Sequence, residues 1–267
     1  MTTLKNTLAT FAKITKKHIA DFAIAAIIYA ALLVILSIPV MVITGQIAPP
    51  ADSISSILER GIEKLQSGYT LAKSLSPEEI RILSLSASIY FVGATLVKSF
   101  FLGGFINMAV SGGTIRERLS VFFSKGLALT PRMVSMSLLL AAFIVFIIMA
   151  GAIVGLIVYP AAVLFVLASG FIAVFFAIRL QLAPFGFALT KKPVMETLVS
   201  SYETSAPFFW VIAGISFVVY IAFWAMSNLA GRIIGLTELI MSIETIVTLM
   251  LLLPVYTEAT NRKMENA

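Results

Sequence analysis

Residues 133–158, with the sequence MVSMSLLLAAFIVFIIMAGAIVGLIV, decide the fold of this chain because they contain no charged residue. A second apolar stretch, residues 161–183, follows directly after Tyr159–Pro160. A helix of about 20 apolar residues crosses the hydrocarbon core of a bilayer, which is about 30 Å thick. The two stretches therefore predict a transmembrane helical hairpin with a minimal connection.

Four further stretches have the same length and character: residues 20–43, 82–105, 208–228 and 236–256. Apolar residues make up 60% of the chain, charged residues 12%, and the mean hydropathy is +1.03. A water-soluble domain with this composition would expose most of its apolar side chains to water. Membrane β-barrel strands would alternate in polarity, which these continuous runs do not. The sequence predicts an all-α polytopic membrane protein with six transmembrane helices in one domain, residues 1–267.

A short amphipathic segment precedes the first, third and fifth stretches, so the chain reads as three copies of one unit: an amphipathic helix followed by a helical hairpin. Such helices lie in the headgroup plane with their apolar face toward the acyl chains, although simple connectors are the alternative. The residues expected on that face are Leu4, Leu8, Phe11, Ala12 and Thr15; Ile115, Leu119, Phe122, Phe123 and Gly126; and Val194, Leu198, Ser201, Tyr202 and Ser205.

The distribution of Lys and Arg predicts the orientation, because basic residues accumulate on the cytoplasmic side. Twelve basic residues fall on one side of the six spans and five on the other. We therefore expect both termini in the cytoplasm of a prokaryotic cell, with the protein in the plasma membrane. The twelve are Lys5, Lys13, Lys16, Lys17, Arg116, Arg118, Lys125, Arg132, Lys191, Lys192, Arg262 and Lys263; the five are Arg60, Lys64, Lys73, Arg81 and Arg232.

Residues 45–81 form the one sizeable outer connection that this topology predicts. Residues Ile54–Tyr69 have the spacing of an amphipathic helix over the outer surface. Ser76–Glu79 then gives a helix start, with serine as the N-cap, Pro77 at the first helical position and a glutamate at the third. The second span is therefore expected to begin outside the hydrocarbon core.

Among the charged residues of the expected spans, four are candidates for a functional role: Lys98, Arg179, Glu238 and Glu244. A charge at the bilayer centre costs about 2.5–3.5 kcal/mol on insertion scales, so such residues are functional candidates. Counting along parallel spans places Lys98 and Arg179 in the cytoplasmic half, Glu238 at the outer edge and Glu244 about 10 Å below that edge. This register does not favour direct pairing of Glu244 with Lys98.

Two interpretations of the cations stay open. In the first, Lys98 and Arg179 converge with Arg116 or Arg132 on an anionic lipid phosphate near the cytoplasmic surface. In the second, their long side chains snorkel to the headgroups. Glu244, together with Glu238, is either a hydrogen-bonded structural group or part of a translocation path.

The sequence predicts no catalytic residue, metal ligand or cofactor. It contains no cysteine and a single histidine, His18, which is expected to be interfacial. No glycine-rich segment has the Gly-Lys-Ser/Thr ending of a nucleotide loop. Gly103–Gly104 and Gly112–Gly113 are instead expected to be packing notches or turns, and Gly151–Gly155 predicts close helix packing through its small-xxx-small spacing.

Three segments give the chain a resemblance to a known family: Phe101–Phe105 leading into Ile115–Leu119, Arg179–Pro184 followed by Glu196–Tyr202, and Pro254–Tyr256 before Asn261–Lys263. Their order resembles the six-span membrane domain fused to some glycerophosphoryl diester phosphodiesterases and related stand-alone families. The resemblance implies membrane residence and proximity to lipid, without the catalytic barrel.

The function expected from these observations is a non-enzymatic scaffold or binding protein for membrane partners or lipids. Anionic lipid headgroups are the expected partners, with a membrane protein as a further option and nucleic acid excluded. The alternative is a transporter or translocator of a small solute or lipid that uses Lys98, Arg179 and Glu244.

Overall fold

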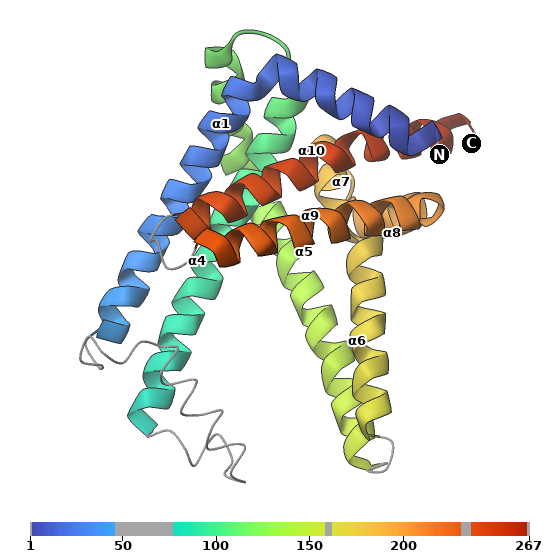
Figure 1. The fold of residues 1–267 in the computed structure, drawn as a ribbon. Coiled ribbons are helices and arrows are strands. Elements are labelled where there is room, and N and C mark those ends of the chain that lie inside the picture. Colours follow the sequence, from blue (N-terminus) through green and yellow to red (C-terminus); the bar gives the residue numbers. More distant parts are fainter. Residues whose placement is uncertain (1, 46–76, 158–161, 231–235, 266–267) are drawn as a thin grey trace. The chain divides into compact units, whose positions relative to one another are not determined.

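The computed structural model describes residues 2–45, 77–157, 162–230 and 236–265, and every regular element in these ranges is a helix (Figure 1). The fold class predicted from the sequence is confirmed. The elements are α1 (Thr2–Gly45), α4 (Pro77–Val110), α5 (Ile115–Ile157), α6 (Ala162–Arg179), α7 (Ala183–Leu189), α8 (Val194–Ser205), the 3-10 turn η2 (Ala206–Phe208), α9 (Phe209–Ala230) and α10 (Leu236–Glu265).

Six segments within these elements are long and apolar enough to cross a membrane, as expected. They are Ile19–Pro39, Ser84–Val110, Ile115–Gly151, Leu167–Leu189, Val194–Asn228 and Glu238–Asn261. The fourth helix differs from the prediction: α6 ends at Arg179, not at residue 183. The chain turns at residues 180–182, and Pro184 lies in the first turn of α7, where a missing amide hydrogen is tolerated.

The three predicted repeats, each an amphipathic helix followed by a helical hairpin, differ in how the amphipathic segment joins its span. In α1 and α5 the two parts form one uninterrupted helix, whereas α8 and α9 are separated by η2 (Figure 1). Pro77, where the sequence predicts a helix start, is the first described residue of α4, and the predicted N-cap Ser76 lies outside the described residues. The outer helix predicted over Ile54–Tyr69, the Tyr159–Pro160 hairpin and most side chains of the first amphipathic face lie outside the described residues.

The helices fall into two compact units, Met1–Tyr29 with Lys98–Ala267 and Ala30–Val97. In the second unit α1 and α4 pack closely, because a Cβ atom at Gly93 would collide with the side chain of Leu36. In the first unit the most extensive helix pairs are α5 with α6 and α9 with α10. An aromatic cluster joins α1, α4 and α5 there and includes Tyr29 stacked on Phe101 with 4.3 Å between ring centroids.

Glycines set two helix crossings in the first unit, as the sequence predicted. A Cβ atom at Gly104 of α4 would meet the backbone carbonyl of Phe122 in α5, and one at Gly151 of α5 would meet the hydroxyl of Ser169 in α6. Gly113 has a φ of 102° in the turn between α4 and α5. Residues other than glycine rarely adopt this left-handed backbone conformation. These glycines serve packing and chain reversal.

A buried ion pair that was not predicted from the sequence links α1 to the start of α5. The Arg118 guanidinium lies 2.8 Å from an Asp21 carboxylate oxygen, and the two side chains are 11% and 2% exposed. Arg118 also donates a hydrogen bond of 2.7 Å to the carbonyl of Gly113. The pair therefore ties the first helix to the turn that begins α5.

Candidate functional site

The cation at Arg179 is the centre of the candidate site. Arg179 is the last residue of α6, where the negative end of the helix dipole favours a positive charge. The Ser205 hydroxyl at the end of α8 donates a hydrogen bond of 2.7 Å to the Arg179 carbonyl. Two residues further along the chain, the Gln181 side-chain oxygen accepts a hydrogen bond of 2.6 Å from the Ser216 hydroxyl of α9. Residues of α8 and α9 thereby fix the backbone that carries the cation.

The Arg179 side chain is half-buried against aromatic rings. Its guanidinium carbon lies 4.1 Å from the centroid of Tyr202 in α8 and 5.8 Å from that of Phe175. Its Nε atom is buried without a hydrogen-bond partner, and no described carboxylate forms an ion pair with it. Cation–π contacts of this kind contribute about 0.5–2 kcal/mol. They orient the guanidinium but leave hydrogen-bonding capacity for an anion.

An apolar groove of about 300 Å³ opens next to this cation. We call it the α5–α6–α8 groove. Tyr202 belongs both to its wall and to the Arg179 contact, and Phe176 stacks on Tyr202 with 5.7 Å between ring centroids. The lining residues are Leu139, Leu140 and Phe143 from α5, Phe176 and Leu180 from α6 and the turn after it, and Met195, Leu198, Val199 and Tyr202 from α8.

The orientation of α8 exposes apolar residues toward this groove. The face that packs on the protein carries Thr197, Ser201 and Ser205, while Met195 and Val199 are 69% and 52% exposed. The predicted face grouped Ser201 and Ser205 with the apolar side, which is wrong for contact with lipid. Thr197 and Ser205 donate hydrogen bonds to the Pro193 and Tyr202 carbonyls. Small residues on this face allow close helix packing, so the bulkier apolar residues turn outward.

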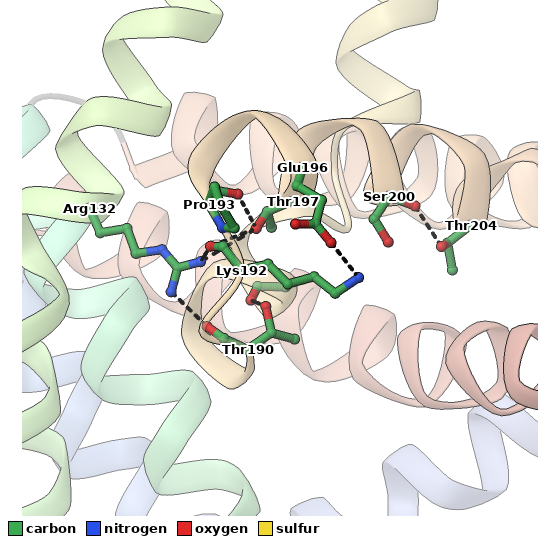
Figure 2. Close-up of polar contacts among 9 residues, drawn as sticks. Arg132, Thr190, Lys192, Pro193, Glu196, Thr197, Ser200 and Thr204 are labelled. Atoms are coloured by element: carbon green, nitrogen blue, oxygen red, sulfur yellow. Dashed lines mark hydrogen bonds and ion pairs between the residues drawn. The ribbon is translucent and has the colours of Figure 1, made fainter.

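Arg132, a predicted anion-binding residue, has other partners (Figure 2). Its guanidinium donates a hydrogen bond of 2.6 Å to the Thr190 carbonyl, a second to the Lys192 carbonyl and a third of 3.4 Å to the Thr197 hydroxyl. It also lies 5.2 Å from the centroid of the Phe187 ring. These contacts hold the loop between α7 and α8, so Arg132 acts as a positioning residue for α8.

The same loop exposes a basic side chain outside the candidate spans. The Lys192 ammonium lies 2.9 Å from the Glu196 carboxylate, and both residues are exposed (Figure 2). The hydrogen bond to Glu196 and its negative charge raise the pKa of Lys192 above the ordinary value of a lysine. Lys192 is therefore protonated at neutral pH beside the first turn of α8.

The other predicted site residues lie elsewhere in the first unit. The Lys98 ammonium and the Glu244 carboxylate interact electrostatically, without a direct ion pair between them. Arg116 is exposed, and Glu238 is half-buried with its carbonyl accepting a hydrogen bond from Ser242 at 2.7 Å.

Two groups in this region were missed by sequence reasoning. Tyr202 was assigned only to an amphipathic face, yet it carries the contact with Arg179. Asp21 was not among the predicted site residues, yet it is almost completely buried. A buried acid at a span boundary requires a cation, so Asp21 could have prompted a search for a partner such as Arg118.

Comparison with known proteins gives no relative: no family model, curated protein or solved structure matches the chain. The resemblance to the phosphodiesterase-linked membrane domain therefore stays a prediction.

Proposed function

We propose that this chain is a non-enzymatic integral membrane protein that binds anionic lipids, with Arg179 as the headgroup-binding cation. The observation that carries the proposal is the position of its guanidinium: half-buried on Tyr202, without an ion-paired carboxylate among the described residues, and next to an apolar groove. An amphiphile with a negative headgroup complements such a site, because it supplies both the missing charge and the apolar chain.

A binding role also fits the side chains that surround Arg179. The residues around Arg179 are aromatic, aliphatic or hydroxyl-bearing, and they include no acid–base pair in the position of a nucleophile and its base. Retention of lipids would also suit a scaffold that organises membrane-protein partners.

Replacing Arg179 with methionine is expected to reduce retention of anionic phospholipid about tenfold or more. A hydrogen bond to a charged group contributes about 1.5–3 kcal/mol, and about 1.4 kcal/mol corresponds to tenfold in affinity. Native mass spectrometry of detergent-solubilised protein, loaded with equal amounts of anionic and zwitterionic phospholipid, measures this retention. The matched control is Lys125→Met, which removes an exposed cation of α5 and should leave retention unchanged. Equal retention by the Arg179 variant and the original protein would contradict the proposal.

Transport is the second candidate function, favoured by the electrostatic interaction of Lys98 with Glu244 inside the candidate spans. Charged groups at membrane depth mark ion and substrate paths in many transporters. Substrate-dependent flux in reconstituted vesicles, lost in both Lys98→Met and Glu244→Gln, would favour this function over lipid binding.

We further propose a plasma-membrane location with both termini in the cytoplasm, on the basis of the twelve-to-five bias of basic residues. Single cysteines introduced at Ser67 and Ser124 of this cysteine-free chain are expected to differ in their accessibility to a membrane-impermeant maleimide. In intact cells Ser67→Cys should be labelled, and Ser124→Cys should be labelled only after permeabilisation. The reverse pattern would invert the topology.

A further inference from the structure

We propose that the α5–α6–α8 groove holds one acyl chain of the anionic phospholipid whose phosphate binds Arg179. This inference rests on the proposed function and adds to it a defined place for the lipid tail. The site would then retain a specific lipid after the surrounding bilayer is removed.

The size and lining of the groove fit a single chain. Its volume of about 300 Å³ is at the lower end of the range of about 300–1,000 Å³ for small-molecule sites. Flexible aliphatic residues line both sides, and the rings of Phe143, Phe176 and Tyr202 interrupt them. Such walls offer dispersion contacts along a methylene chain and no side-chain hydrogen-bonding group except the Tyr202 hydroxyl.

The position of Tyr202 fixes the orientation of the lipid, with the headgroup at Arg179 and the acyl chain in the groove. Its ring is part of the groove wall and also lies 4.1 Å from the Arg179 guanidinium carbon. A chain in contact with the Tyr202 ring therefore places its headgroup within reach of the cation. Lys192, protonated next to the first turn of α8, adds positive charge beside the same helix.

A transmembrane helix of a partner protein fits the groove less well. A helix with its side chains is about 10–12 Å in diameter, and close helix association in membranes uses small residues that let backbones approach. The large apolar residues exposed on α8 are instead Met195 and Val199, and Leu139 of α5 is 46% exposed. Bulky, flexible side chains around a narrow groove favour an acyl chain.

The chain offers a matched control in a second apolar groove of about 310 Å³ between α1 and α10. It is lined by residues that include Ile27, Ile243 and Val247, and none of its described lining residues is basic. A lipid chain can enter both grooves in a bilayer, and in the α5–α6–α8 groove the wall residue Tyr202 is in contact with the Arg179 cation. We therefore expect stronger selectivity for anionic headgroups in the α5–α6–α8 groove.

The experiment places a photoreactive benzoylphenylalanine at Val199 or at Ile27 in the full chain, reconstituted in vesicles with equal amounts of anionic and zwitterionic phospholipid. At Val199 we expect lipid adducts with an anionic-to-zwitterionic ratio about tenfold higher than at Ile27, since one charged hydrogen bond accounts for at least that factor. The ratio at Val199 should fall to the Ile27 value in the Arg179→Gln background.

A second measurement separates the chain site from the headgroup site. Val199→Trp fills the groove without touching the cation, and we expect it to reduce anionic-lipid retention in native mass spectra about fivefold or more, whereas Ile27→Trp should not. Loss of retention in Arg179→Gln but not in Val199→Trp would overturn the groove and leave the headgroup site. No effect of either substitution would overturn both proposals, and photoadducts with a copurifying protein instead of lipid at Val199 would overturn the groove as a lipid site.

Discussion

Replacing Asp21 with alanine is expected to destabilise the protein by about 3–5 kcal/mol, because removal of one partner leaves the other charge buried and uncompensated. The Asp21 side chain is 2% exposed and lies 2.8 Å from the Arg118 guanidinium. The Arg118 Nε atom is already buried without a hydrogen-bond partner among the described residues. Loss of the carboxylate would remove the countercharge of a group that water hardly reaches.

The measurement is the equilibrium unfolding of purified protein in one detergent, for Asp21→Ala, Arg118→Gln and the double variant. A coupled pair predicts that the double variant is less destabilised than the sum of the single variants, as a double-mutant cycle measures. Arg116→Gln is the matched control, since Arg116 is two residues away on the same helix and exposed; surface substitutions usually change stability by less than about 0.5 kcal/mol. Strict additivity of the two variants would contradict a direct contribution of the ion pair.

The number and approximate position of the spans could be predicted from sequence because the bilayer imposes one length on every apolar helix. The packing role of Gly104 and Gly151 could also be predicted, since these glycines belong to no nucleotide-loop motif and small residues in apolar helices allow helix backbones to approach closely. These predictions depend only on local composition and spacing. The structure has six helices long and apolar enough to cross a membrane, and it shows both glycine contacts.

The contacts of the charged residues could not be predicted, because they depend on how distant helices pack. Arg132 holds the loop before α8 through backbone carbonyls of Thr190 and Lys192, which every residue possesses and no motif marks. Arg179 contacts the aromatic face of Tyr202, whereas the sequence indicated either an anionic lipid phosphate or snorkelling to the headgroups for this cation.

The helices predicted to be interfacial show a further limit of prediction from sequence patterns. Hydrophobic periodicity distinguishes an amphipathic segment from an apolar one but does not say whether the helix breaks between them. The α5 helix continues from Ile115 to Ile157 through Pro131. In the third predicted repeat, η2, which contains Pro207, separates α8 from α9. Proline is tolerated within a helix where packing compensates the lost hydrogen bond. Tertiary contacts thus decide between continuation and a break.

Substitution of Gly104 by leucine is expected to disrupt the packing of α4 on α5. A Cβ atom at this position would collide with the carbonyl oxygen of Phe122 and lie 3.0 Å from its ring. Overpacking a dense interior usually costs about 1–3 kcal/mol and more where the backbone must move. We expect alanine to cost an amount in that range and leucine to cost more, because the helices would have to separate around Phe101, Phe105 and Phe122, which are each at most 1% exposed.

The thermal unfolding midpoint in detergent measures this effect, with Gly170→Leu as the control. Gly170 lies within α6, and a Cβ atom added there would have no neighbouring atom within 4 Å. Leucine at this position should therefore be neutral or stabilising through its better helix propensity, by up to about 1 kcal/mol. Because the collision at Gly104 involves a backbone oxygen, Phe122→Ala should not rescue the Gly104→Leu variant. Rescue by Phe122→Ala would show that the side chains, and not the approach of the two backbones, set the α4–α5 crossing.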